Sequence, residues 1–227
     1  MSMAAMSSRD SAARTTIPQH RAVGVLIIAT GVLSLALLAL HPGGDAKTFA
    51  DVLKNEASNR FIDGLVHGGF IAVLAVQLVC YVVFSARLGL SRVTTIAGLV
   101  FFAMGAMFLC GSMVLDGLAT PAVAARYLAA PAKIEFAKAL FVLIGTLIGV
   151  LMPIGLMFQS AAIAMWGWAL AQSRQSPKLG YVSAAVGAAL VAVLTMGFGA
   201  SNPIILMSAL VVTAGWAATV GVLLIRA

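Results

Sequence analysis

The residues of this sequence that could do chemistry gather where its apolar segments begin and end. Asp63 and His67 lie four positions apart in FIDGLVHGGF, so on a helix they occupy one face. Asp116 ends one apolar segment, and Glu135 begins the next, three residues before Lys138. Their positions along the segments place these polar groups at nearly the same depth, and they could converge if the segments are neighbours. One histidine and several carboxylates could then bind a small solute or a divalent cation, or relay protons.

A purely structural interpretation of the same residues stays open. Acidic side chains mark the point where a membrane helix meets water, and Asp63 and Glu135 also suit the positive N-terminal ends of their helices. Glu135 and Lys138 could simply pair with each other. His67 has no such explanation, because it lies one turn inside the apolar segment, where polar groups are costly.

A second pattern, in MGAMFLCGSMVLD, repeats sulfur and carboxylate side chains every three residues. Thioether and thiolate ligands suit copper(I). A period of three drifts around a helix of 3.6 residues per turn, so only adjacent members share a face, and methionine is also a common packing residue. Copper binding therefore stays an alternative, and its candidate metal ligands are His67, Cys110, Met113 and Asp116.

Several enzyme classes lack their signatures. The sequence contains no G-x-x-x-x-G-K-[ST], H-E-x-x-H, G-x-S-x-G or C-x-x-C, which are typical of nucleotide-driven, zinc protease, esterase and dithiol chemistry. A haem held by two histidines would require His41 and His67 to face each other from adjacent helix ends. We assign no catalytic residue, and the cofactor stays open, with a metal ion as one possibility.

The elements that must position these residues are membrane helices. Hydrophobic residues make up 62% of the 227 positions and charged residues only 9%, whereas soluble domains are about half apolar and a quarter charged. A span needs roughly 20 apolar residues. The sequence therefore predicts an all-α bundle of six transmembrane helices in one domain, 22–227, after a disordered cytoplasmic tail, 1–21. The spans lie near 22–40, 63–86, 93–115, 136–171, 179–199 and 204–225.

The net charge of +7 is distributed unevenly between the two sides of this topology. The ends and loops on one side hold eight basic residues against one acidic residue, and those on the other side hold six of each. By the positive-inside rule, both chain ends lie in the cytoplasm. No basic cluster for nucleic acid is present. We expect a multi-pass protein of the cell membrane, in the bacterial inner membrane, with lipid as its surroundings.

The fourth predicted span is unusually long. As one helix it would reach nearly twice the hydrocarbon thickness, so we expect a kink near Pro153 and an end that stands above the lipid. A helix broken at mid-membrane for substrate binding is the alternative. Gly145 and Gly149 form a G-x-x-x-G that permits close helix contact. The connections 41–60 and 117–133 are expected to form a small outer loop cap.

Three functions follow from these patterns. The first is transport or sensing of a small solute or ion, through a polar site of Asp63, His67, Asp116, Glu135 and Lys138. The second is a non-catalytic subunit that packs against partner membrane proteins or copies of itself. The third is a metal-dependent membrane enzyme or a metal handler, with copper as one candidate.

Overall fold

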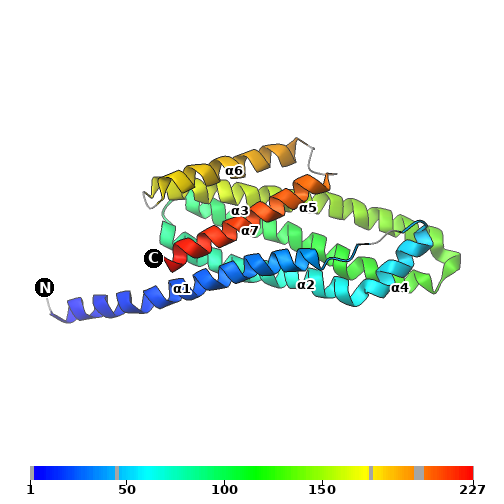
Figure 1. The fold of residues 1–227 in the computed structure, drawn as a ribbon, viewed down its shortest axis with the longest axis horizontal. Helices are drawn as coiled ribbons and strands as arrows, with labels where there is room; N and C mark the ends of the chain where they lie inside the picture. The colour runs from blue at the N-terminus through cyan, green and yellow to red at the C-terminus, as the bar shows by residue number, and fades with distance from the viewer. Residues whose placement is uncertain (1–2, 44–45, 174–175, 197–201, 227) are drawn as a thin grey trace.

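The fold is a bundle of long helices, seen in a computed structural model that describes residues 3–43, 46–173, 176–196 and 202–226. Within these ranges there is no strand. Six of the helices are long and apolar enough to cross a membrane, which agrees with the number predicted from the sequence. The sequence prediction of an all-α, multi-pass architecture is confirmed to this extent. Figure 1 shows that these helices lie side by side and run along one common direction. The short helix α4 lies at one end of the bundle.

The element bounds differ from the predicted spans mainly in length. The helices are α1 (Met3–Ala39), α2 (Phe49–Leu88), α3 (Val93–Val114), a π-helical turn (Leu115–Ala119), α4 (Thr120–Leu128), a 3-10 turn (Pro131–Lys133), α5 (Ile134–Gln172), α6 (Pro177–Thr195) and α7 (Pro203–Ile225). The segment 1–21, predicted to be a disordered tail, continues α1 back to Met3.

The cap is helical, so the predicted loop cap is wrong on this point. Helix α2 begins at Phe49 because Thr48 and Asp51 form a capping box, in which each side chain binds the other's backbone N–H. At 40 residues, α2 is about 60 Å long, roughly twice the hydrocarbon thickness. Its first turns, together with α4 and the start of α5, extend past the other helices (Figure 1). We call this the cap end.

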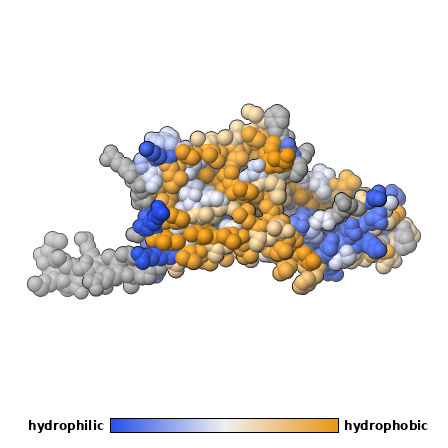
Figure 2. Space-filling model, in the orientation of Figure 1, coloured by the Kyte–Doolittle hydropathy of each residue, from blue (hydrophilic) through white to orange (hydrophobic). Residues whose placement is uncertain are grey.

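The opposite end of the bundle is basic. Arg87 Nη1 donates to the Leu223 carbonyl at 2.6 Å, and Arg92 Nη1 donates to the Ala169 carbonyl at 3.0 Å. These bonds tie the end of α2 and the start of α3 to the ends of α7 and α5. The start of α1 and the end of α7 also lie here, as Figure 1 shows. In Figure 2 an apolar belt separates the hydrophilic residues of the two ends. We call this second end the basic end.

Helix α5 runs unbroken from Ile134 to Gln172 through Pro153. The alternative of a helix broken at mid-membrane is therefore contradicted, whereas the kink near Pro153 remains a prediction. Toward the basic end, α5 carries the centre of the core, Trp166, which is fully buried and stacks on Tyr81 at 4.6 Å between ring centroids. Its indole Nε1 donates to Ser85 Oγ at 3.0 Å, so its polar atom is satisfied.

Candidate metal centre

Two histidines and one aspartate meet at the cap end. His41 follows the end of α1, His67 lies on α2, and Asp116 lies in the π-helical turn after α3. Each offers one ligand atom, and the three atoms lie within 4.8 Å of one another. His67 Nε2 is 3.2 Å from Asp116 Oδ2, and His41 Nε2 is 4.0 Å from the same oxygen. His67 is 3% exposed, whereas His41 and Asp116 are 42% and 34% exposed. The group therefore has a buried side and an accessible side.

The hydrogen bonds fix which ring nitrogens face the centre. His67 Nδ1 is 2.8 Å from the Asp63 carbonyl oxygen, and His41 Nδ1 is 3.1 Å from the Pro42 carbonyl oxygen. A carbonyl oxygen only accepts, so Nδ1 carries the proton in both rings. In the neutral tautomers each Nε2 then directs a lone pair at the Asp116 carboxylate. A backbone carbonyl that holds the outer N–H of a histidine is the usual second shell of a metal ligand.

A lone pair on nitrogen facing a carboxylate oxygen at 3.2 Å requires a positive charge between or upon them. A proton on His67 Nε2 supplies one such charge and a metal ion supplies another. Two ligands bound about 2.1 Å from a zinc ion at the tetrahedral angle are about 3.4 Å apart, close to the 3.2 Å observed here. Two imidazoles and one carboxylate also match the ligand types that zinc and iron(II) accept, and they leave further positions open.

The π-helical turn places Asp116 in this group. Pro121 lies two residues into α4, in a chain that is helical from Val93 to Leu128. A proline in a continuous helix has no N–H for the carbonyl four residues before it, and its ring clashes with that carbonyl, here that of Gly117. The helix widens instead, and both the backbone N–H and the hydroxyl of Thr120 donate to the Leu115 carbonyl. Such a turn rotates the residues within it, and single π-turns are frequent at functional sites.

Gly117 allows His67 to approach this turn. A Cβ built on Gly117 would lie 2.3 Å from both Cβ and Cγ of His67. Any side chain at this position would therefore collide with the imidazole. The pair Asp116–Gly117 thus supplies both the carboxylate and the space for its partner.

Two further carboxylates lie near the centre. Asp63, one turn before His67 on α2, is 5% exposed, and Glu56 lies two turns further toward the cap on the same face. Both interact electrostatically with His67 and Asp116. These two side chains add carboxylate oxygens beside the centre, which favour a cation when they are ionised.

Glu135 and Lys138, two of the residues predicted for the site, pair with each other. Lys138 Nζ is 2.6 Å from Glu135 Oε1 on the exposed surface at the start of α5. Neither belongs to the group around His67.

The sulfur-containing side chains of α3 do not lie on one face of the helix. Met107 is 75% exposed and Met104 is 38% exposed, whereas Met113 is buried and Cys110 packs against the core. This distribution follows the drift expected for a period of three.

The sequence pattern left two neighbours of His67 out of the predicted site. His41 could have been found, because HPGG ends the first apolar segment at the depth where the second begins. Glu56 could not, because it fell in a segment expected to be a loop, and only the helix from Phe49 shows that it shares a face with Asp63.

No protein-family model, curated protein or solved structure matches this chain.

Proposed function

We propose that this multi-pass membrane protein binds a divalent transition-metal ion on the outer side of the membrane and senses that ion. The observation that carries the proposal is the tautomer arrangement at the cap end. His41 and His67 each hold Nδ1 against a backbone carbonyl and present Nε2 to Asp116. Zinc is the first candidate, because two imidazole nitrogens and a carboxylate oxygen suit a site with an open position.

The orientation follows from the charge distribution. The excess of basic residues lies at the basic end, which the positive-inside rule assigns to the cytoplasm. The cap end then faces outward, and exposed His41 and half-buried Asp116 give a metal ion from outside access to the centre.

Sensing is favoured over transport by the residues directly inward of the centre. Leu37, Val66 and Val73 are buried there, with Phe70 packed against them. These side chains offer no ligand for a cation that leaves His67 toward the membrane interior. An ion held by α1, α2 and the π-helical turn would instead fix these three elements relative to one another.

Metal binding by the purified full-length protein tests the proposal. Metal-stripped protein in lipid nanodiscs is titrated with zinc by calorimetry and with cobalt(II) by its ligand-field absorption. We expect one ion per chain, and a loss of affinity of at least about tenfold in His67→Ala, His41→Ala and Asp116→Asn. His20→Ala is the matched control, because His20 is the one histidine of the chain outside the proposed centre and lies on α1 far from the cap end.

Two results would contradict the proposal. If His67→Ala binds zinc as tightly as the unchanged protein, the centre is not the metal site, and a proton bridges His67 and Asp116. If sealed vesicles that contain the protein accumulate zinc faster than vesicles with His67→Ala, the protein transports the ion, and sensing is the wrong function.

A further inference from the structure

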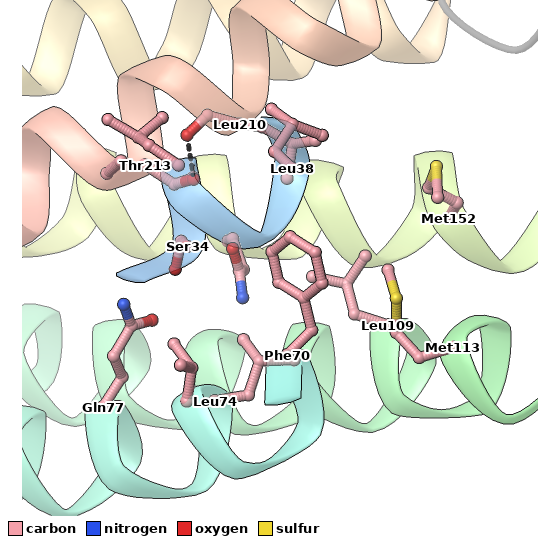
Figure 3. Close-up of a pocket in the computed structure, with 14 residues that line it drawn as sticks. Ser34, Leu38, Phe70, Leu74, Gln77, Leu109, Met113, Met152, Leu210 and Thr213 are labelled. Atoms are coloured by element: carbon pink, nitrogen blue, oxygen red, sulfur yellow. Dashed lines mark hydrogen bonds between the residues drawn. The ribbon is translucent and has the colours of Figure 1, made fainter. Parts of the chain in front are cut away.

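A cavity lies one helical turn inward of the metal centre, between α1, α2, α3, α5 and α7 (Figure 3). Its lining residues Leu38, Phe70 and Met113 are each three positions along the chain from a residue of the centre. The cavity has a volume of about 50 Å³, and none of the residues that line it is charged. It is mostly apolar, so it suits an apolar group more than an ion.

Two hydroxyl groups in this cavity already donate to their own helices. Thr213 Oγ1 donates to the Leu210 carbonyl at 2.8 Å, which Figure 3 marks, and Ser34 Oγ donates to the Thr30 carbonyl at 2.9 Å. In the same view Gln77 reaches from α2 toward Ser34 on α1.

Two buried donors beside the cavity have no partner. Gln159 on α5 is 4% exposed and Trp216 on α7 is 5% exposed, and neither Gln159 Nε2 nor Trp216 Nε1 has a hydrogen-bond acceptor within the described residues. An unsatisfied buried donor costs about 1–3 kcal/mol. The indole N–H can only donate, so the missing partner must be an acceptor.

Both donors line a second, smaller cavity of about 10 Å³. It shares Gln77, Gln159 and Thr213 with the larger cavity, so the two are adjacent. A volume of about 10–15 Å³ holds one water-sized group. The smaller cavity therefore has room for one oxygen atom next to two donors, and the larger cavity has room for the apolar part that carries it.

The larger cavity lies next to the lipid-facing surface of α1. Leu35 is among its lining residues, and this side chain is 42% exposed on the outside of α1. A molecule dissolved in the bilayer can therefore enter past α1, without crossing the polar cap, and can extend beyond the cavity into lipid.

We propose that these joined cavities bind a neutral, lipid-soluble molecule with a carbonyl oxygen, which accepts hydrogen bonds from Gln159 Nε2 and Trp216 Nε1. A charged ligand is excluded because no lining side chain would compensate its charge. The site does not depend on a metal ion at His67, so each proposal can fail without the other.

The test uses the full-length protein in nanodiscs with 15N in its tryptophan indoles, and 2-decanone as the probe. The chain has three tryptophans, so three indole signals are expected, and Trp216→Phe identifies one of them. We expect 2-decanone to shift the Trp216 signal saturably, while decane, which lacks the carbonyl, does not. Trp168, which is 46% exposed on the surface, is the internal reference for the probe dissolved in lipid.

Gln159→Met keeps the approximate shape of the side chain and removes the donor. We expect this variant to bind 2-decanone about five to ten times more weakly, as for the loss of one hydrogen bond. Gln172→Met, at an exposed glutamine near the end of the same helix, is the matched control and should bind normally. An unmoved Trp216 signal, equal shifts with decane, or unchanged affinity in Gln159→Met would each overturn the proposal.

Discussion

At the scale of single residues, Gly117 is expected to affect metal binding through the space that it leaves for the His67 ring. We expect Gly117→Ala to displace the His67 ring, because the new Cβ would lie 2.3 Å from His67 Cγ. The zinc affinity should fall about ten- to a hundredfold, as when other groups that orient a ligand are lost. Calorimetric titration of the variant measures this.

The matched control is Gly111→Ala, on the same polypeptide stretch. A Cβ at Gly111 would meet only Leu151 Cδ1 at 3.5 Å, an ordinary contact. Normal zinc binding by both variants would show that His67 can move without cost to the site.

For the residues of the proposed centre, the sequence predicted depth in the membrane but not the orientation of the side chains. The sequence placed His67 and Asp116 at one depth, since each is a fixed number of residues from the end of an apolar segment. It could not show that Nδ1 of His67 faces the Asp63 carbonyl, because that depends on the rotamer and the neighbouring turn. The ligand atom Nε2 is therefore determined by the three-dimensional packing around His67, which the spacing of residues does not encode.

At the scale of elements, Pro121 maintains the π-helical turn that carries Asp116. We expect Pro121→Ala to restore an ordinary α-helical bond to the Gly117 carbonyl and to rotate Asp116 away from the histidines. The zinc affinity should fall at least about tenfold, while the helix content measured by circular dichroism stays the same.

Pro177→Ala is the control for this variant. Pro177 is at the first turn of α6, where a proline replaces no intrahelical hydrogen bond. If Pro121→Ala binds zinc normally, the turn is not what positions the carboxylate.

The G-x-x-x-G motif of α5 makes no close contact with another described helix of the same chain. Nothing lies within 4 Å of a Cβ built on Gly145 or Gly149, the two residues of the predicted packing motif. Close contact with α6 is made instead by Gly167 of α5, whose Cβ would lie 2.5 Å from the Ala184 backbone nitrogen, and by Gly180 of α6, whose Cβ would lie 2.3 Å from the Ala171 backbone nitrogen. The spacing of small residues shows that a helix can be approached closely, but the neighbour decides where this happens.

This contrast predicts opposite effects of the same substitution. We expect Gly180→Ala to destabilise the protein by about 1–3 kcal/mol, because α5 and α6 must separate. Gly145→Ala should be neutral or slightly stabilising, because alanine favours the helix and meets no neighbour. Thermal unfolding in one detergent compares the two; equal melting temperatures would contradict the packing seen between α5 and α6.

At the scale of the whole molecule, hydrophobic length and charge together predicted six helices. Apolar runs of about 20 residues indicate spans, and the positive-inside rule favoured one span over two in the long fourth run. The cap was missed for a corresponding reason. Residues 49–60 carry mixed charge and no apolar run, and their helix depends on the Thr48–Asp51 capping box and on continuity with the apolar part of α2. The arrangement of the helices does not show which end of the bundle faces the cytoplasm. That assignment rests on the distribution of basic residues.

That direction can be tested in intact cells with single cysteines. Ser58 is exposed on α2 at the cap end, whereas Ser176 precedes α6 at the basic end. We expect a thiol reagent that cannot cross membranes to label Ser58→Cys from outside and to label Ser176→Cys only after the cells are opened. The natural Cys80 is buried and Cys110 is half-buried between the two ends, so the unchanged protein gives the background. The reverse labelling would place His67 and Asp116 in the cytoplasm. The proposed metal centre would then bind an ion from inside the cell, through the same ligand atoms.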